Sequence, residues 1–146
     1  MIYHTRKLVK PEDLNAGGSL FGGTLLRWID EEAAIYVMCQ LDSKNVVTKF
    51  MSEINFVSPA RTGDVVEIGL ETVKFGKSSI TVKCIARVKQ TQKIIITIDK
   101  IVFVQLDEHS ILFLTEKADQ WSDHQLNGVN GGLPLSLLQH AEWNRL

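Results

Sequence analysis

One stretch of the chain constrains its fold more than any other: residues 24–41 contain neither glycine nor proline. Apolar residues recur there at spacings that place them along one face of a helix. They are Leu25, Leu26, Ile29, Ala33, Val37 and Leu41, and Trp28, Ala34, Ile35 and Met38 widen the apolar surface. Because so little polar surface remains, we expect a long helix that other parts of the structure largely enclose.

Four stretches rich in Val, Ile, Thr and Phe follow this helix, at residues 46–57, 64–75, 79–89 and 94–106. Turn-forming segments separate them at 59–63, 76–78 and 90–92, a pattern typical of strands. We predict four long strands in an antiparallel meander, with a short strand at 5–9 before the helix. The fold class is therefore α+β, with a curved antiparallel sheet wrapped around one long central helix.

Two of the predicted strand segments, 94–98 and 101–104, are apolar at consecutive positions and hence on both faces of a strand. This pattern predicts that the outer face of the sheet also packs against something. We therefore expect a homo-oligomer.

The composition of the chain argues against several classes of function. The 16 Lys and Arg against 17 Asp and Glu give no positive field to hold a nucleic-acid backbone. The spacing of Cys39 and Cys84 is not that of metal ligands. Each falls in an apolar stretch, so we expect both thiols to be buried and to act as small hydrophobic side chains. No segment reaches the roughly 20 apolar residues of a membrane span, and the chain does not begin with a leader pattern, so we expect a cytoplasmic protein.

The length of 146 residues fits one domain. We place it at residues 1–108, with 109–146 as a C-terminal extension packed on the same domain. A helix that begins at Pro134 and runs to residue 143 is the expected element of this extension.

The residues around the start of the helix carry the candidate chemistry. Asn15 begins a glycine-rich loop that ends in Gly22 and Gly23, and Asp30 follows on the helix. Two glycines leave the first backbone N–H groups of a helix uncrowded, and the helix dipole favours negative charge there, so an oxyanion site is expected. A carboxylate beside apolar groups can orient a water molecule and accept its proton.

Each of these features also has an ordinary structural explanation. A glycine pair often begins a helix, and an asparagine in a loop often forms a turn. Asp30 could belong to a solvated acidic turn, residues 30–32, in which Glu31 pairs with Arg27 one turn away. The combination at this spacing is more specific than its parts.

The segments 15–23 (NAGGSLFGG) and 28–34 (WIDEEAA) resemble the signature of the bacterial short-chain acyl-CoA thioesterases of the hotdog superfamily. Residues 52–59, 63–66, 76–79 and 102–107 resemble later segments of the same family. The resemblance runs from about Thr5 to Asp107, and the tail after Asp107 does not resemble the family's usual ending.

The resemblance implies a hotdog fold, dimers with active sites at the subunit interface, and often hexamers that are trimers of dimers. Asp30 would match the catalytic carboxylate, acting as general base or nucleophile. Gly22 or Gly23 would match the backbone donor to the thioester oxygen, and Asn15 the polar partner from across the interface.

The implied reaction is hydrolysis of acyl-coenzyme A to a carboxylic acid and coenzyme A. The thiolate is a good leaving group, so neither a strong general acid nor a metal or cofactor is expected. The candidate residues for binding coenzyme A are Arg61 and the turn Gly76, Lys77, Ser78 and Ser79.

Three alternatives remain open at this point. The first is a non-catalytic module that binds acyl-CoA or lipid in the same groove. The second is a hotdog hydratase or dehydratase, which would carry a histidine in the site helix or the loop before it, where this chain has none. The third is an interaction scaffold, in which Asp30 would be dispensable.

Overall fold

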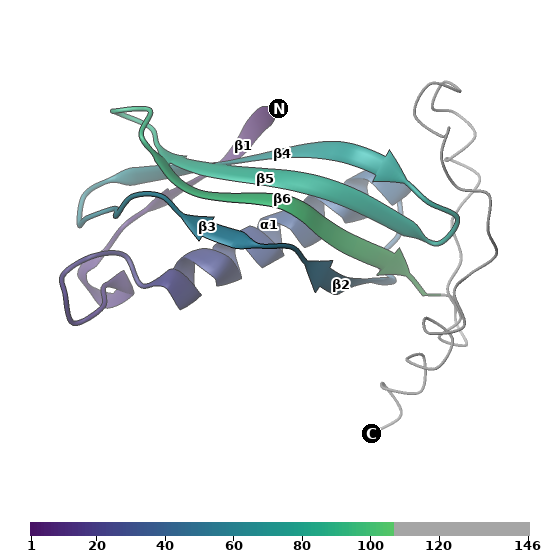
Figure 1. Cartoon of the computed structure of the whole chain (residues 1–146), viewed down its shortest axis with the longest axis horizontal. Helices are drawn as coiled ribbons and strands as arrows, with labels where there is room; N and C mark the ends of the chain where they lie inside the picture. The colour runs from purple at the N-terminus through teal and green to yellow at the C-terminus, as the bar shows by residue number, and fades with distance from the viewer. Residues whose placement is uncertain (107–146) are drawn as a thin grey trace.

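The computed structural model describes residues 1–106, which form one helix, one short 3-10 helix and six strands (Figure 1). In chain order the elements are β1 (Ile2–Leu8), η1 (Pro11–Asp13), α1 (Gly22–Leu41), β2 (Val46–Met51), β3 (Ile54–Phe56), β4 (Val65–Phe75), β5 (Ser79–Val88) and β6 (Ile94–Gln105). The predicted C-terminal extension and its helix lie outside the described residues.

The long helix is confirmed. It begins after Phe21 and ends at Asp42, whose left-handed backbone (φ 51°) turns the chain and whose N–H donates to the Met38 carbonyl. Its buried residues are Leu25, Trp28, Ile29, Ala33, Val37 and Leu41, and they pack on one face of the sheet. The sheet encloses one side of the helix, whereas Ile35 on the other side is 51% exposed in a single chain.

All strand pairs are antiparallel, in the order β1-β4-β5-β6-β2, with β3 also pairing with β6. The predicted meander is correct for β4, β5 and β6 but wrong for the stretch 46–57. That stretch divides into β2 and β3 and pairs with β6, while β1 pairs with β4. The eight residues 57–64 exceed a tight hairpin loop and carry the chain across the end of the sheet.

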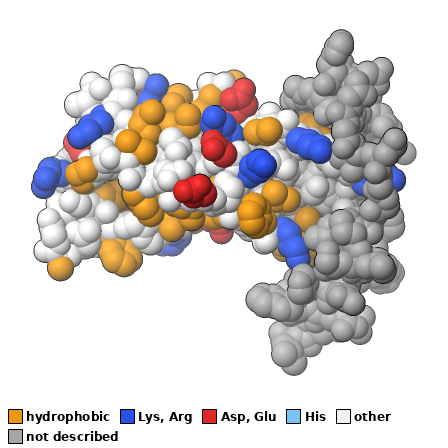
Figure 2. All heavy atoms as spheres, in the orientation of Figure 1, with side chains coloured by type: hydrophobic (Ala, Val, Ile, Leu, Met, Phe, Trp, Pro, Cys, Tyr) orange, Lys and Arg blue, Asp and Glu red, His pale blue; other side chains and the backbone are white. Residues whose placement is uncertain are grey.

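The apolar run at the start of β6 has a different cause from the one predicted. Ile94 pairs with Arg87 and Ile96 with Ala86, so Ile95 is an extra residue in a bulge. Ile95 and Ile96 are both buried as a result. The bulge does not account for the second apolar run, because Phe103 and Val104 are consecutive, regularly paired with Ile80 and Ser79, and both buried. Figure 2 shows hydrophobic side chains interspersed with charged ones on the face turned to the viewer.

The two cysteines differ in their exposure to solvent. Cys84 is fully buried in the sheet, as predicted, and burial raises the pKa of its thiol to about 12. Cys39 is exposed on the helix, so the prediction of a buried thiol is wrong there. The helical pattern places Cys39 off the stripe that meets the sheet.

Candidate active site

The start of helix α1 presents free backbone donors. Phe21 provides no side-chain cap, and the first main-chain bond of the helix is donated by Leu25 N–H to the Phe21 carbonyl. The N–H groups of Gly22 and Gly23 therefore have no acceptor within residues 1–106. Two bonds fix this end: Leu20 N–H to the Ala60 carbonyl and Phe21 N–H to the Asp13 carbonyl, both 2.8 Å.

Both glycines lie beneath an aromatic ring. A Cβ atom on Gly22 would lie 3.0 Å from Cζ of Phe56, and one on Gly23 would lie 2.8 Å from Cε1 of Phe21. Any side chain at either position would push a ring aside. The predicted role of the glycine pair as an open helix start agrees with this geometry.

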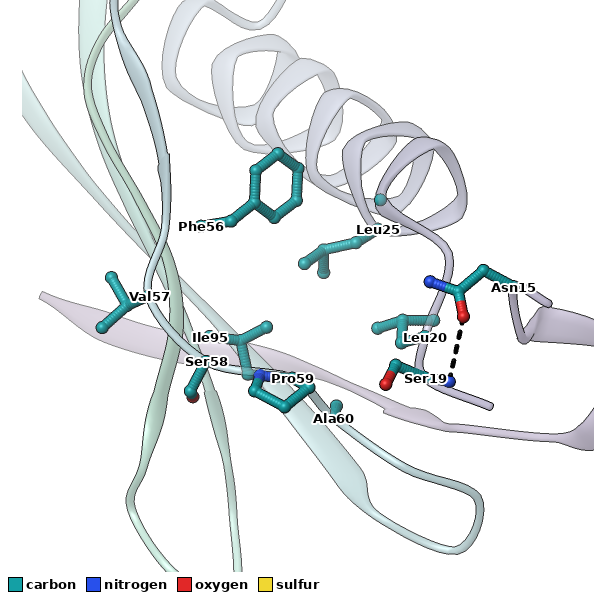
Figure 3. A pocket seen from close by; sticks show the side chains of 11 residues that line it. Asn15, Ser19, Leu20, Leu25, Phe56, Val57, Ser58, Pro59, Ala60 and Ile95 are labelled. Atoms are coloured by element: carbon teal, nitrogen blue, oxygen red, sulfur yellow. Dashed lines mark hydrogen bonds between the residues drawn. The ribbon is translucent and has the colours of Figure 1, made fainter. Parts of the chain in front are cut away.

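Asn15 shapes the loop before the helix and also faces the pocket. Its Oδ1 accepts hydrogen bonds from Gly17 N–H (2.9 Å) and Ser19 N–H (3.1 Å), which closes a turn around Gly18 at φ 73°. The Asn15 Nδ2 group has no acceptor among the described residues and points toward the pocket in Figure 3. Asn15 thus forms a turn and still offers a donor.

A pocket of about 480 Å³ opens beside these donors (Figure 3). Its lining within residues 1–106 is largely apolar and includes no charged side chain. The lining residues are Asn15, Ser19, Leu20, Gly22, Leu25, Phe56, Val57, Ser58, Pro59, Ala60 and Ile95. Pockets of this size and composition commonly hold small-molecule ligands.

Asp30 lies further along the helix, half-buried, beside strand β2. Its Oδ1 accepts a hydrogen bond of 2.8 Å from the hydroxyl of Thr48. No cation within residues 1–106 forms an ion pair with this carboxylate. The carboxylate is therefore oriented by a neutral group and keeps a free oxygen.

The three acidic side chains of residues 30–32 have different surroundings and do not form one solvated acidic surface. Glu32 accepts a hydrogen bond from the Thr5 hydroxyl and lies 3.8 Å from Lys7 Nζ, so it ties the helix to β1. Glu31 is exposed, and no ion pair joins it to Arg27 within the described part of the chain. Only Asp30 faces the edge strand β2.

Within one chain the two halves of the predicted site do not meet. Asp30 is eight residues beyond Gly22, or about 12 Å along the helix axis. The N–H groups of the first turn point away from the body of the helix, so an oxygen bound there lies further still. A base must lie within about 3 Å of its water, and the water within about 3.5 Å of the carbonyl carbon. One chain alone cannot span this gap.

The residues predicted to bind coenzyme A lie at opposite ends of the sheet (Figure 1). Arg61 is exposed in the turn before β4, next to Ala60 at the helix start. The turn 76–79 follows β4, whose 11 residues span about 35 Å. Lys77 there is exposed, Ser79 half-buried and Ser78 buried. A bond from Gly76 N–H to the Ser79 carbonyl (2.7 Å) closes this turn.

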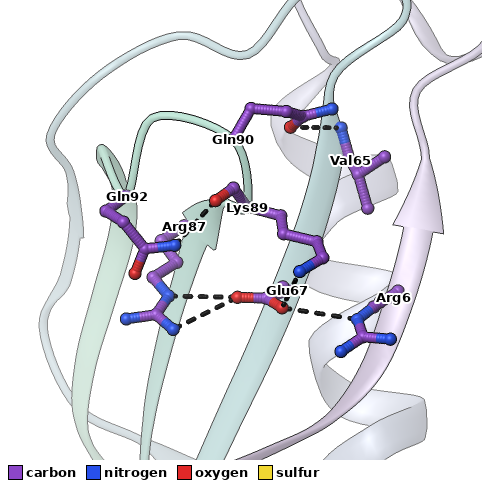
Figure 4. Close-up of polar contacts among 7 residues, drawn as sticks. All are labelled: Arg6, Val65, Glu67, Arg87, Lys89, Gln90 and Gln92. Carbon is purple, nitrogen blue, oxygen red and sulfur yellow. Dashed lines mark hydrogen bonds and ion pairs between the residues drawn. The ribbon is translucent and has the colours of Figure 1, made fainter.

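A second carboxylate, Glu67 on β4, has very different surroundings (Figure 4). It is 5% exposed and contacts Arg6 (3.3 Å), Arg87 (3.2 Å) and Lys89 (3.7 Å). Burial alone would raise the pKa of Glu67, but hydrogen bonds from Arg87 and Arg6 and the nearby Lys89 charge hold it below its ordinary value. Arg87 also lies 3.7 Å from the centre of the Tyr3 ring.

Residues 1–106 contain neither a metal-binding cluster nor a membrane-spanning helix. No group of three or more His, Cys, Asp or Glu residues there is placed to hold a metal ion. No helix in that range is long and apolar enough to cross a membrane. The expectation that no metal or cofactor is needed stays a prediction.

Sequence reasoning missed two residues that belong to these surroundings. Thr48, which bonds to Asp30, stands in an ordinary β-branched strand pattern that carries no separate signal. Phe56 covers Gly22 because β3 pairs with β6 rather than with β4, and the strand order was predicted incorrectly.

Comparison with known proteins places these features in a family. Residues 17–95 match the model of the thioesterase superfamily. An uncharacterized acyl-CoA thioester hydrolase of Haemophilus influenzae is 36% identical over 85 residues, which are 58% of this chain and 54% of that protein. A second such protein, from Buchnera aphidicola subsp. Baizongia pistaciae, is 31% identical over 109 residues, 70% of this chain and 80% of the relative. For the first curated relatives, the match spans little more than half of their length.

Solved structures of thioesterases have the same fold as this chain. The hexameric thioesterase of Yersinia pestis superposes with a TM-score of 0.72 at 30% identity, covering 78% of this chain and 95% of that one. An acyl-CoA hydrolase of Staphylococcus aureus has a TM-score of 0.69 at 30% identity, covering 75% and 66%. The predicted hotdog fold is thus confirmed. Since the family match also covers more than half of the 146 residues, this chain belongs to the thioesterase superfamily.

Proposed function

We propose that this protein hydrolyses acyl-coenzyme A thioesters, with Asp30 as the catalytic carboxylate. The observation that carries the proposal is the state of Asp30: a half-buried carboxylate, oriented by Thr48 and free of cations within the described residues. Such a group can accept a proton from water or attack a thioester carbonyl directly. Coenzyme A then leaves as a thiolate.

We further propose that each active site needs two copies of the chain. The Asp30 carboxylate of one copy would face the helix start of another, where Gly22 or Gly23 and Asn15 offer free donors. These donors would stabilise the negative charge on the thioester oxygen. Asp30 lies beside β2, an edge of the described sheet, so a partner can approach it. A dimer is the smallest unit that meets this need, and a hexamer built from dimers meets it too.

Relatives support both parts of the proposal. The S. aureus hydrolase was solved with butyryl coenzyme A and coenzyme A. Asp→Ala and Asn→Ala variants of it were also solved, and the two substituted positions are fifteen residues apart, as Asn15 and Asp30 are here. The Y. pestis thioesterase is hexameric.

Coenzyme A would be held at its charged end by Arg61, or by Lys77 with the turn 76–79. In a two-copy site these turns come from opposite sheet ends of different chains, so both remain candidates. The cytoplasmic location expected from the sequence stays part of the proposal.

The test is hydrolysis of a panel of acyl-CoA esters from acetyl to dodecanoyl, with the released thiol measured. The wild type should hydrolyse at least part of the panel, and folded Asp30→Ala should not. If the wild type binds coenzyme A but hydrolyses nothing, the non-catalytic acyl-CoA-binding module becomes the better account.

A further inference from the structure

Phe56 occupies an unusual position for a phenylalanine. It is 56% exposed at the end of β3, yet its ring covers the start of helix α1, so that a Cβ atom on Gly22 would meet two of its ring atoms within 3.2 Å. Phe56 is not part of the buried core of the single chain, so what distinguishes it from other exposed apolar residues is its place over the helix start and in the pocket lining. Figure 3 shows the ring at the mouth of the pocket, between the helix and the strand.

The pocket behind this ring is suited to methylene groups. Its inner wall is formed by buried apolar residues: Leu20, Leu25, Ala60 and Ile95. No charged residue among the described ones lines it, so the phosphates of coenzyme A would find no partner in this part of the chain. Of its polar side chains, Ser58 already donates its hydroxyl hydrogen to the Ile94 carbonyl. An acyl chain fits this lining better than the amide-bearing arm of coenzyme A does.

The entrance to the pocket joins this apolar space to the free donors. Gly22 belongs to the lining, and Asn15 Nδ2 points toward the same space. A thioester oxygen bound at the Gly22 N–H would leave the acyl chain next to Phe56, with the inner wall beyond it. The ring therefore lies where the second and later carbons of the chain must pass.

We propose that Phe56 sets the length of the acyl chain that this protein accepts. This inference rests on the proposed thioesterase function and assigns the apolar pocket to the acyl group. A smaller residue at position 56 extends the space available to the chain, and a larger one shortens it. Each methylene that gains full contact is worth about a fourfold gain in binding.

The experiment compares kcat/KM across straight-chain acyl-CoA esters for wild type, Phe56→Ala, Phe56→Leu and Phe56→Trp. We expect Phe56→Ala to raise the ratio of octanoyl to butyryl turnover by about tenfold or more, with Phe56→Leu between it and wild type. Phe56→Trp should lower the ratio. The matched control is Phe50→Ala, which removes another exposed phenylalanine (53%) that does not line the pocket, and its ratio should equal that of wild type.

A uniform change across all chain lengths would overturn the proposal, because it would mean that the ring contacts coenzyme A or only stabilises the fold. The same shift in Phe50→Ala would also overturn it. Binding of non-hydrolysable S-alkyl coenzyme A thioethers of increasing length, measured by calorimetry, separates this inference from the proposed function. If the wild type hydrolyses no ester, the thioesterase proposal fails, while the dependence of Kd on chain length in wild type and Phe56→Ala still decides the role of Phe56.

Discussion

Two regions of helix α1 each contain half of what thioester hydrolysis requires. At its start, Gly22, Gly23 and Asn15 offer hydrogen-bond donors beside an apolar pocket that no acidic side chain of residues 1–106 lines. About two turns further on, Asp30 offers a carboxylate whose one hydrogen-bond partner among the described residues is Thr48. On the proposed function, one chain would therefore supply two complementary half-sites rather than one complete site. Variants of each half should therefore fail in different ways.

The largest effect is expected for Asp30→Asn. The amide keeps the shape of the side chain and can still bond to Thr48, but it cannot accept a proton or attack a carbonyl. We expect kcat to fall by about 10²–10⁴-fold with little change in the melting temperature. Steady-state kinetics and thermal denaturation measure the two quantities. Activity close to wild type in a folded Asp30→Asn protein would remove this residue from catalysis.

At the other half, Gly22→Pro removes one donor without breaking the helix, since proline is accepted at the first helical position. If Gly22 N–H stabilises the oxyanion, kcat should fall by about 10²–10³-fold. Gly22→Ala is the matched control, because it also pushes on Phe56 but keeps the N–H. Equal losses in both variants would attribute the effect to crowding and not to the donor.

A smaller effect is expected at Thr48. Thr48→Val removes the hydroxyl that orients Asp30 and should lower kcat about ten- to a hundredfold. Thr48→Ser keeps a hydroxyl and should restore most of the loss. The measurement is kcat and KM for both variants. If Thr48→Ser is as impaired as Thr48→Val, the residue contributes packing and not orientation.

The smallest effect on activity is expected at Glu67, a carboxylate with a structural role. Glu67→Gln should leave kcat/KM within about twofold of wild type, since Glu67 lies outside both half-sites, but it should lower stability at pH 7 because Arg6, Arg87 and Lys89 lose their partner.

The pH dependence of this loss has a definite sign. The folded pKa of Glu67 is held below its ordinary value of 4.5, so the unfolded chain binds more protons as the pH falls through that range. The stabilisation is present above pH 4.5 and is lost below it. Urea denaturation of wild type and Glu67→Gln should give midpoints that converge in acid. A gap that stays constant down to low pH would contradict the ion-pair explanation.

Much of this arrangement follows from the sequence. The uninterrupted apolar stretch 24–41 predicts the helix, the β-rich stretches predict the strands, and the segment 15–23 predicts the open helix start. These features are determined by the periodicity of apolar residues and by the positions of glycines, which are patterns within a few neighbouring residues. The separation of Gly22 and Asp30 also follows from their spacing once a helix is assumed.

Apart from Cys39, whose exposure follows from its position on the helix, the errors concern contacts between distant parts of the chain. Residues 46–57 have a strong strand pattern, but nothing in it specifies β6 as the partner in place of β4. The bulge at Ile95 made a buried run resemble a strand with two apolar faces. Thr48 and Phe56 become important only because of that pairing, so they could not be found by local pattern.

Mixing two inactive chains tests most directly the claim that the half-sites of two copies combine. One chain carries Asp30→Asn and the other carries both Asn15→Ala and Gly22→Pro, and the two are co-expressed and assayed together. Random pairing of equal amounts makes half of the dimers mixed, and one of the two sites in each mixed dimer contains both intact halves. We therefore expect recovery of about a quarter of wild-type activity. Activity no higher than that of the separate variants, in a preparation shown to contain mixed dimers, would contradict it.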